Sequence, residues 1–406
     1  MDPSTSSGGS ASLTVHQLLR QFSPAYLQRF GDSVPLRQRQ GLQRLLRCRT
    51  PELGGQLFAC RPCERFAFRY HSCQDRHCPQ CGQTDADQWL ARQRARLLFQ
   101  VPYFLVTFTI PEALRAWMRS HPTLAYDLLF AASAQALQDL AQNPRRLGAQ
   151  LGMLGVLHTW TRQLIYHPHL HYLVPGGGLS ADGRAWVPTR RPTYLFNAFA
   201  LADRCRALFA EKLRAQDPEA CARVPRKVWK QRWVTDVAPA GSGQNALRYL
   251  SRYIFKTATG NRKLEPLPDG RIRWPYRNSR SGQQAHVALT PHEFIRRFLQ
   301  HILPQGYHRV RCFGWLHPAA KVRANRVRAL LKTAPLLTPA EQQAWLPPPQ
   351  EPEEFDPPEP LAPLAQSAAA ARSAPCCPNC RLAMTLVASW KPGRAPPILL
   401  ARAPST

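Results

Sequence analysis

The sequence predicts an α+β fold in which helices alternate with strands that include an antiparallel hairpin, with a helical arm in front and a disordered tail behind. Three observations support this class. Apolar residues recur at helical spacing in several segments, short runs rich in β-branched and aromatic residues separate them, and two adjacent apolar runs are spaced as a hairpin. Hydrophobic residues make up 44% of the 406 residues, enough for a packed core.

The first hundred residues contain helical segments on either side of a cysteine-rich segment. Leu and Phe at helical spacing predict two basic helices within residues 13–47. Residues 48–82 concentrate cysteines. Residues 84–99, "TDADQWLARQRARLLF", return to a helical pattern with an acidic start and a basic end, which suits the helix dipole.

The middle of the chain supplies the expected sheet. "YFLVTFTI" (103–110) is a predicted strand that stops at a proline, and a helical region follows over 112–147. "GMLGVLHTW" and "HLHYLVPGG" are two apolar runs joined by a short polar loop, which predicts an antiparallel hairpin. A helix (197–215), a strand "RWVTDVA", a second helix (244–257) and a basic segment to about residue 333 complete the globular part.

Three units follow from this pattern. Residues 1–95 are expected to form the helical arm and the cysteine-rich domain, and residues 96–335 the main domain. Residues 336–406 are proline-rich and locally acidic, typical of a linker or tail, and end in a Cys-x-x-Cys pair.

Net charge points to a polyanionic partner. Lys and Arg total 54 against 25 Asp and Glu, giving a formal charge of +29. Such an excess favours nucleic acid, because neutralised phosphates release condensed counterions. A basic surface that only confers solubility is the alternative.

Targeting signals are not evident. The N-terminal "MDPSTSSGGSAS" lacks the charged and apolar regions of a signal peptide, and "LLFQVPYFLVTFTI" is too short and polar to span a membrane. We therefore expect a cytoplasmic protein without membrane contact. Twelve cysteines in a reducing compartment indicate metal binding rather than disulfides.

Two cysteine pairs have the spacing of a four-cysteine zinc ribbon. Fourteen residues separate the Cys60/Cys63 pair from the Cys78/Cys81 pair, and two such turns can present four thiolates to one structural zinc ion. Buried cysteines packed as small hydrophobic residues are the alternative. Nearby side chains could replace a member of the set; these are Cys73, His71 and His77. The late pair, Cys377 and Cys380, is only half a site, which could chelate weakly with Cys376 or have no role.

Three histidines alternate in "YHPHLHYLVPGGGL". On a strand, His169 and His171 project from one face, and His167 joins them if Pro168 does not break the strand. His158 on the preceding strand could reach the same place. Imidazoles on a rigid strand suit a divalent ion such as Zn, Mn or Mg. Beside a basic surface, that ion could polarise a phosphate oxygen. Ordinary surface or core histidines are the alternative.

Two tyrosines four residues apart are candidate nucleophiles. On a helix, Tyr249 and Tyr253 of "NALRYLSRYIFKTATG" share one face, and Arg248, Arg252 and Lys256 form a basic row. Such a pair alone is more often packing. Together with the histidines, the tyrosine pair suggests that a tyrosine hydroxyl attacks the phosphorus of a DNA phosphate, which gives a phosphotyrosine and a free 3′-hydroxyl.

The pairing of "HPHLH" with a downstream "YLSRY" resembles the HUH (His–hydrophobic–His) endonuclease superfamily, and within it the two-tyrosine transposases of the insertion sequence 91 family. "LLRCRTPELGG", "YHSCQDRHCPQC", "VPYFLVTFTIPEAL" and "EFIRRFLQHILPQGYHRVRCFGWL" carry the similarity further, over roughly residues 13–320. The resemblance implies an N-terminal zinc-binding domain and an HUH-type antiparallel sheet flanked by helices.

The resemblance also implies a role for each candidate. His169 and His171 match the ligands of a catalytic Mg or Mn, with His167 and then His158 as candidates for the third position. Tyr249 and Tyr253 match the nucleophiles, the four cysteines match the zinc turns, and the basic row is assigned to DNA binding. The implied activity is nicking and rejoining of single-stranded transposon ends and target DNA through 5′-phosphotyrosine, in rolling-circle-like transposition. A replication initiator or relaxase, and a non-catalytic zinc-dependent DNA-binding protein, are the alternatives.

Overall fold

A computed structural model describes the chain in segments. They are residues 13–81, 98, 101–242, 259–261, 263–278, 281–333 and 374–394. Of the predicted elements, helix 244–257 lies outside these residues, as do nearly all of helix 84–99 and most of the tail.

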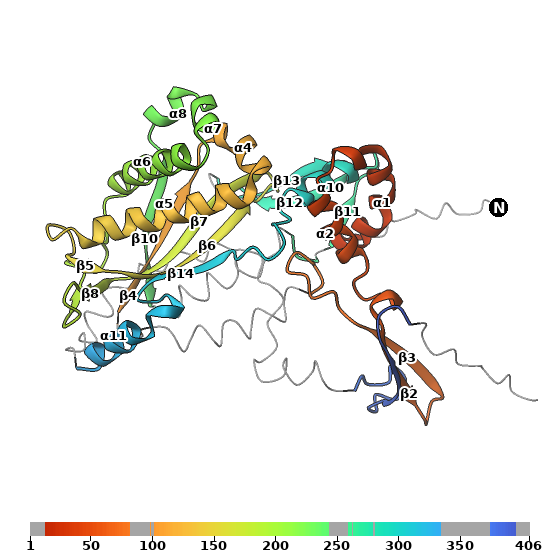
Figure 1. Cartoon of the computed structure of the whole chain (residues 1–406). Coiled ribbons are helices and arrows are strands. Elements are labelled where there is room, and N and C mark those ends of the chain that lie inside the picture. Colours follow the sequence, from red (N-terminus) through yellow and green to blue (C-terminus); the bar gives the residue numbers. More distant parts are fainter. Residues whose placement is uncertain are drawn as a thin grey trace, which may run out of the picture.

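A five-stranded antiparallel sheet forms the centre of the molecule (Figure 1). Its spatial order is β10-β4-β7-β6-β14. The bounds are β4 Pro102–Thr109, β6 Gly152–Trp160, β7 Tyr166–Pro175, β10 Val234–Ser242 and β14 Val310–Gly314. The predicted hairpin is confirmed, because β6 pairs with β7, and so are the two predicted strands that became β4 and β10.

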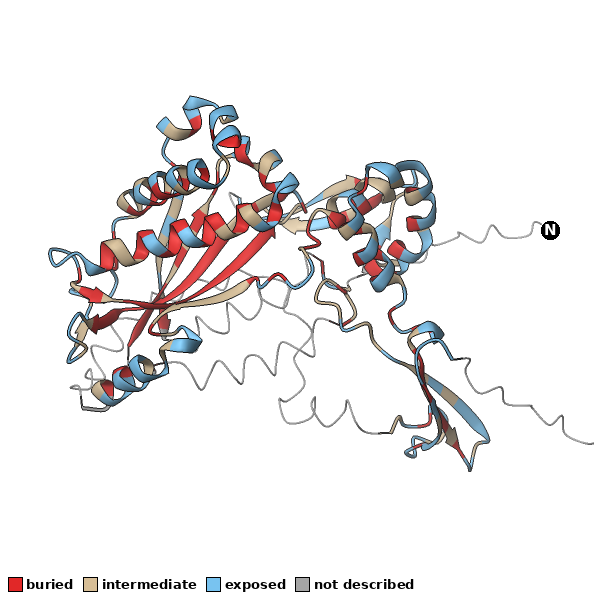
Figure 2. Cartoon of the chain, viewed as in Figure 1, coloured by how far each residue is buried: buried red, intermediate tan, exposed pale blue. Residues whose placement is uncertain are grey.

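One face of this sheet is the main core. The helices α5 (Pro122–Gln142) and α6 (Ala198–Gln216) cover it, and their inner sides are buried (Figure 2). Phe104, Phe108 and Tyr172 are buried beneath them. The Tyr172 hydroxyl contacts Ser133 Oγ of α5 at 2.8 Å, which satisfies a polar group that water cannot reach.

The opposite face is divided along its length. At one end Trp315, with Val327 and Leu331 of α11 (Lys321–Thr333), packs on Leu154, Val156 and Leu173. At the other end the same face carries the histidines of β6 and β7. Every second side chain of a strand lies on the same face. His158 therefore shares a face with Leu154 and Val156 on β6, and His169 and His171 share it with Leu173 on β7.

The N-terminal helices belong to a second core. The two predicted basic helices are α1 (Val15–Phe30) and α2 (Leu36–Leu46), and Thr14 starts α1 with a capping box to Gln17. They pack with residues from late in the main domain, including Trp274 and Phe294. The partner elements are the sheet β1 (Leu13–Thr14), β11 (Lys263–Pro266), β12 (Ile272–Arg277), β13 (Gln284–Leu289) and the helix α10 (Pro291–Leu299).

A third, small sheet joins the two ends of the chain. It consists of β2 (Gly55–Cys60) and β3 (Arg65–Tyr70) with β15 (Thr385–Trp390) paired to β2. The expectation of a tail separate from the rest is therefore wrong for residues 374–394. Gly54 and Gly55 permit the close approach, because a Cβ at Gly54 would lie 2.4 Å from the backbone oxygen of Trp390.

The remaining described elements are short. They are η1 Gly31–Ser33, η2 Pro51–Leu53, η3 Glu112–Leu114, α4 Arg115–Ser120, β5 Ala149–Gln150, β8 Gly177–Ser180, β9 Trp186–Pro188, α7 Pro218–Arg223, α8 Arg226–Lys230 and η4 Pro318–Ala320. None of the helices in the described part of the chain combines the length and apolar character needed to cross a membrane.

Candidate active site

His158, His169 and His171 form one cluster on the central sheet. His169 and His171 point to the same side of β7, and His158 on β6 is the register partner of His169. Their ring centroids are 4.6 to 5.2 Å apart, and one ring nitrogen from each lies within 4.8 Å of the others. Three nitrogen donors held by hydrogen-bonded strands can bind one divalent ion.

Hydrogen bonds to the rings favour the metal-binding tautomer. His169 Nδ1 lies 2.7 Å from the carbonyl oxygen of His167, so it carries a proton and donates. His171 Nδ1 lies 3.0 Å from Thr107 Oγ1 on the adjacent strand β4, which can accept a second such bond. Both contacts orient the ring they touch, and the bond to the His167 carbonyl also leaves Nε2 of His169 free of a proton, as outer partners of metal-binding histidines do.

Burial keeps these imidazoles neutral. It is the main cause that lowers the pKa of His171 to about 3 and the pKa of His158 well below its usual value, with the neighbouring histidines adding to both effects. Burial also lowers the pKa of His169, although its bond to the His167 carbonyl opposes the shift. A neutral ring is the form that binds a metal ion, so this donor set fits a divalent cation near neutral pH.

The geometry favours His158 over His167, the first candidate from the sequence, as the third ligand. His167 lies on the same strand, 5.4 Å from the ring of His169, yet it is not part of the cluster. Its carbonyl oxygen orients His169 instead. His158 completes the set because the β6–β7 register places it directly across from His169.

The proposed nucleophiles and DNA-binding residues are not placed. Tyr249, Tyr253, Arg248, Arg252 and Lys256 all lie outside the described residues.

The cysteines form two separate clusters, and this corrects the single predicted zinc site. Cys78 and Cys81 meet Cys48 and Cys73, with the Cys48 and Cys81 sulfurs 3.3 Å apart. The reason is the hairpin: the Cys60/Cys63 turn lies at its tip, whereas Cys48 and Cys73 lie at its base. At about 3.3 Å per residue, six-residue strands separate tip and base by roughly 20 Å. Cys60 and Cys63 meet Cys377 and Cys380 instead.

The two histidines considered as substitutes have other partners. His77 Nε2 accepts the backbone N–H of Leu303 at 3.1 Å, and its Nδ1 contacts Asp75 Oδ1 at 2.8 Å. His71 Nδ1 lies 3.2 Å from the carbonyl oxygen of Leu53. Neither belongs to a cysteine cluster, so four thiolates without an open position describe the site at the hairpin base, as in structural zinc sites.

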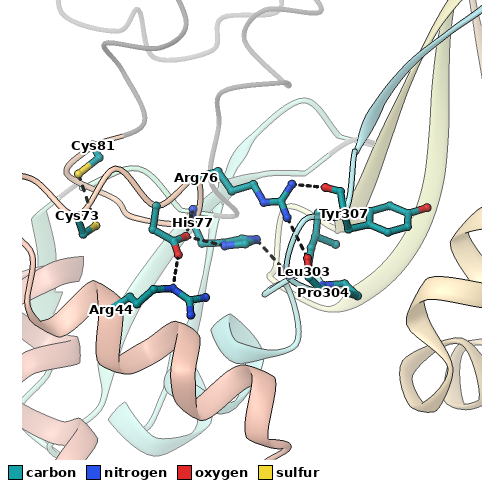
Figure 3. Close-up of polar contacts among 9 residues, drawn as sticks. Arg44, Cys73, Arg76, His77, Cys81, Leu303, Pro304 and Tyr307 are labelled. Carbon is teal, nitrogen blue, oxygen red and sulfur yellow. Dashed lines mark hydrogen bonds and ion pairs between the residues drawn. The ribbon is translucent and has the colours of Figure 1, made fainter.

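The loop of this cysteine cluster is joined to the segment that leads into the central sheet (Figure 3). Arg76 donates to the carbonyl oxygens of Tyr307 and Pro304, and His77 holds Leu303. Arg44 of α2 pairs with Asp75 at 3.0 Å from the other side. Leu303, Pro304 and Tyr307 lie just before β14. The loop of the cysteine cluster therefore links the N-terminal helices to the sheet that carries the histidines.

Family models match both the part of the chain that carries the histidines and the part that carries the N-terminal cysteines. Residues 152–325 match the family model Y2_Tnp, described as "Putative transposase", and residues 18–110 match Zn_Tnp_IS91, described as "Transposase zinc-binding domain". The first match contains the histidine cluster, and the second contains all four cysteines of the hairpin-base cluster. The match to a zinc-binding domain supports structural zinc at that cluster.

Two named relatives cover most of the chain. "Putative transposase y4qJ" of Sinorhizobium fredii (strain NBRC 101917 / NGR234) is 38% identical over 319 residues, which are 74% of this chain and 80% of that protein. "Transposase for insertion sequence element IS801" of Pseudomonas savastanoi pv. phaseolicola is 28% identical over 347 residues, which are 76% of this chain and 80% of that protein. No solved structure matches the chain.

Proposed function

Because this chain belongs to the insertion sequence 91 family of transposases, we propose that it moves its element by nicking and rejoining single DNA strands through tyrosine-linked intermediates. The observation that carries the proposal is the cluster of His158, His169 and His171 on a buried antiparallel sheet. The positive charge of the chain supports a DNA substrate.

The three histidines are proposed to hold Mg or Mn, which when bound would polarise a non-bridging oxygen of the scissile phosphate. His171 and His169 are oriented by Thr107 and by the His167 carbonyl, so the donor atoms need little rearrangement. Burial of His158, which is 1% exposed, keeps that ring neutral and fixed.

Tyr249 or Tyr253 is proposed as the nucleophile. The phenol oxygen attacks phosphorus and loses its proton, a P–O bond to the 3′-oxygen breaks, and that oxygen takes up a proton to become a 3′-hydroxyl. The DNA end stays attached as 5′-phosphotyrosine. The second tyrosine would cleave the other end or the target, and a 3′-hydroxyl then attacks the phosphotyrosine to rejoin the strand. Arg248, Arg252 and Lys256 are proposed to bind the strand.

A nicking assay on a single-stranded oligonucleotide that carries the element's end tests this function. Tyr249→Phe with Tyr253→Phe should abolish cleavage, because no phenol oxygen remains at these positions. His158→Ala should reduce cleavage strongly, whereas the matched variant His167→Ala, on the same face but outside the cluster, should retain most of it.

Two outcomes would reject the proposal. If the doubly substituted chain cleaves as fast as the parent, the tyrosines are not the nucleophiles. If the parent binds DNA equally well with and without Mg or Mn and never cleaves it, the chain is a zinc-dependent DNA-binding protein.

A further inference from the structure

The cysteines at the hairpin tip meet a pair from the far end of the chain. Cys60 and Cys63 lie in the turn between β2 and β3, and Cys377 and Cys380 lie just before β15. The four sulfurs lie within 4.8 Å of one another, and those of Cys60 and Cys380 are 3.4 Å apart. Asn379 Nδ2 also donates to Cys63 Sγ at 3.5 Å. This second cluster extends beyond the segment that matches the zinc-binding family model.

Backbone conformation gives a separate indication. Five non-glycine residues among those described have a left-handed φ, and four of them directly follow a cysteine of one of the two clusters. Around the second cluster these are Glu64 (φ 49°) and Arg381 (φ 61°); around the first they are Arg49 (φ 54°) and Gln74 (φ 50°). An L-residue adopts this conformation only where the surroundings enforce it. Both clusters therefore impose the same local turn, as two sites for the same kind of ion would.

Apolar packing is a weak explanation for the attachment of β15. Among the described residues, the cluster around these cysteines has four buried side chains, Phe58, Cys60, Cys377 and Met384, and elsewhere in the sheet Leu57 and Trp390 are also buried. The outer strand β3 has no buried residue, whereas β2 is mostly buried (Figure 2). Leu386 and Val387 of β15 are 51% and 52% exposed. So small a core needs a covalent or metal link to order a chain terminus.

The donor set identifies the ligand. Four thiolates at one point select zinc over Mg or Mn, because thiolate is a soft ligand that these two harder ions bind poorly, and they leave no position for water or substrate. All four cysteines are free thiols in this structure. We propose that Cys60, Cys63, Cys377 and Cys380 bind a second structural zinc ion, which holds residues 374–394 on the β2–β3 hairpin. This inference is independent of the proposed strand-cleavage chemistry.

Metal content of the full-length chain tests the proposal. Zinc is counted by elemental analysis, and cobalt substitution separates thiolate sites from the histidine cluster, because only thiolates give sulfur-to-cobalt absorption. Cys377→Ser with Cys380→Ser should remove one zinc ion per chain and reduce this absorption to about half, since one of two four-thiolate sites is lost. Cys376→Ser is the matched control: Cys376 is adjacent but exposed and outside the cluster, and its loss should change neither value.

A measurement on the unsubstituted chain covers the case in which the variant does not fold. With a reductant present, alkylation of the zinc-loaded protein should be slow at Cys60, Cys63, Cys377 and Cys380 and fast at Cys376, and a chelator should remove this protection. The proposal is overturned if Cys377 and Cys380 react as fast as Cys376, or if the chelator leaves the protection unchanged, which would indicate that burial and not a metal ion protects them. Unchanged zinc in the double variant, or iron in place of zinc, would also overturn it.

Discussion

Thr107 offers the sharpest test of how the histidine cluster is built. In the structure its hydroxyl oxygen lies 3.0 Å from His171 Nδ1, and the register of β4 against β7 places the two residues directly opposite each other. Valine at this position keeps the β-branched shape that suits the strand but removes the acceptor. His171 is only 8% exposed, so water cannot easily replace the lost partner.

The size of the effect follows from that geometry. Loss of an outer hydrogen bond to a metal-binding histidine weakens metal binding by roughly 10- to 100-fold, or about 1.4 to 2.8 kcal/mol. We therefore expect Thr107→Val to raise the dissociation constant for Mn by this factor. The constant is measured by calorimetric titration or from the electron paramagnetic resonance signal of free Mn. Thr107→Ser, which restores an acceptor, should recover most of the loss.

Thr109 provides the matched control. It lies on the same face of β4, opposite His169, and among the described residues its side chain has no hydrogen bond to that ring. Thr109→Val should therefore change Mn binding little. The reasoning is refuted if Thr107→Val binds Mn as tightly as the parent, or if Thr109→Val is impaired to the same extent.

Two further predictions concern stability. His301, 4% exposed, lies between Thr159 Oγ1 and the Leu164 carbonyl, and burial lowers its pKa to about 4. As pH falls below about 6.5, this imidazole takes up a proton in the unfolded chain before it does so in the folded one. The metal-free protein should therefore lose about 2 kcal/mol of unfolding free energy from this group between about pH 7.5 and about pH 5. In urea titrations His301→Gln should lose correspondingly less, and an identical pH dependence of the two chains would contradict this. His77→Ala should cost about 1–3 kcal/mol in the same titrations because the N–H of Leu303 and the carboxylate of Asp75 each lose a partner. The control His71→Ala removes an exposed side chain with one carbonyl contact and should cost less. Equal costs would argue against the link between the cysteine cluster and the segment before β14.

Local patterns predict four of the five strands of the central sheet and miss β14, which lies in the segment described only as basic. The β6–β7 hairpin follows from two apolar runs around a short polar loop, and the alternation of His169 and His171 follows from the period of a strand. The choice of His158 over His167 could not be made in this way. It depends on the register between two strands, which decides that His158 faces His169 across the hairpin.

The cysteines show where sequence spacing misleads. Short sequence spacing groups the Cys60/Cys63 pair with the Cys78/Cys81 pair, but an intervening hairpin places the two pairs at opposite ends of β2 and β3. The true partners of Cys60 lie at the other end of the chain, and only the pairing of β15 with β2 reveals them. The half-site at Cys377 and Cys380 was the one available signal, since an isolated Cys-x-x-Cys turn needs two more ligands.

Identification of the DNA-linked residue tests the central claim most directly. The full-length chain is incubated with the single-stranded element end and Mn, digested with protease and nuclease, and the nucleotide-bearing peptide is sequenced by mass spectrometry. The account predicts a phosphodiester on Tyr249 or Tyr253, and its absence when Mn is omitted or when His158 is replaced by alanine. A nucleotide on any other side chain, or cleavage that yields no protein-linked DNA, would contradict it.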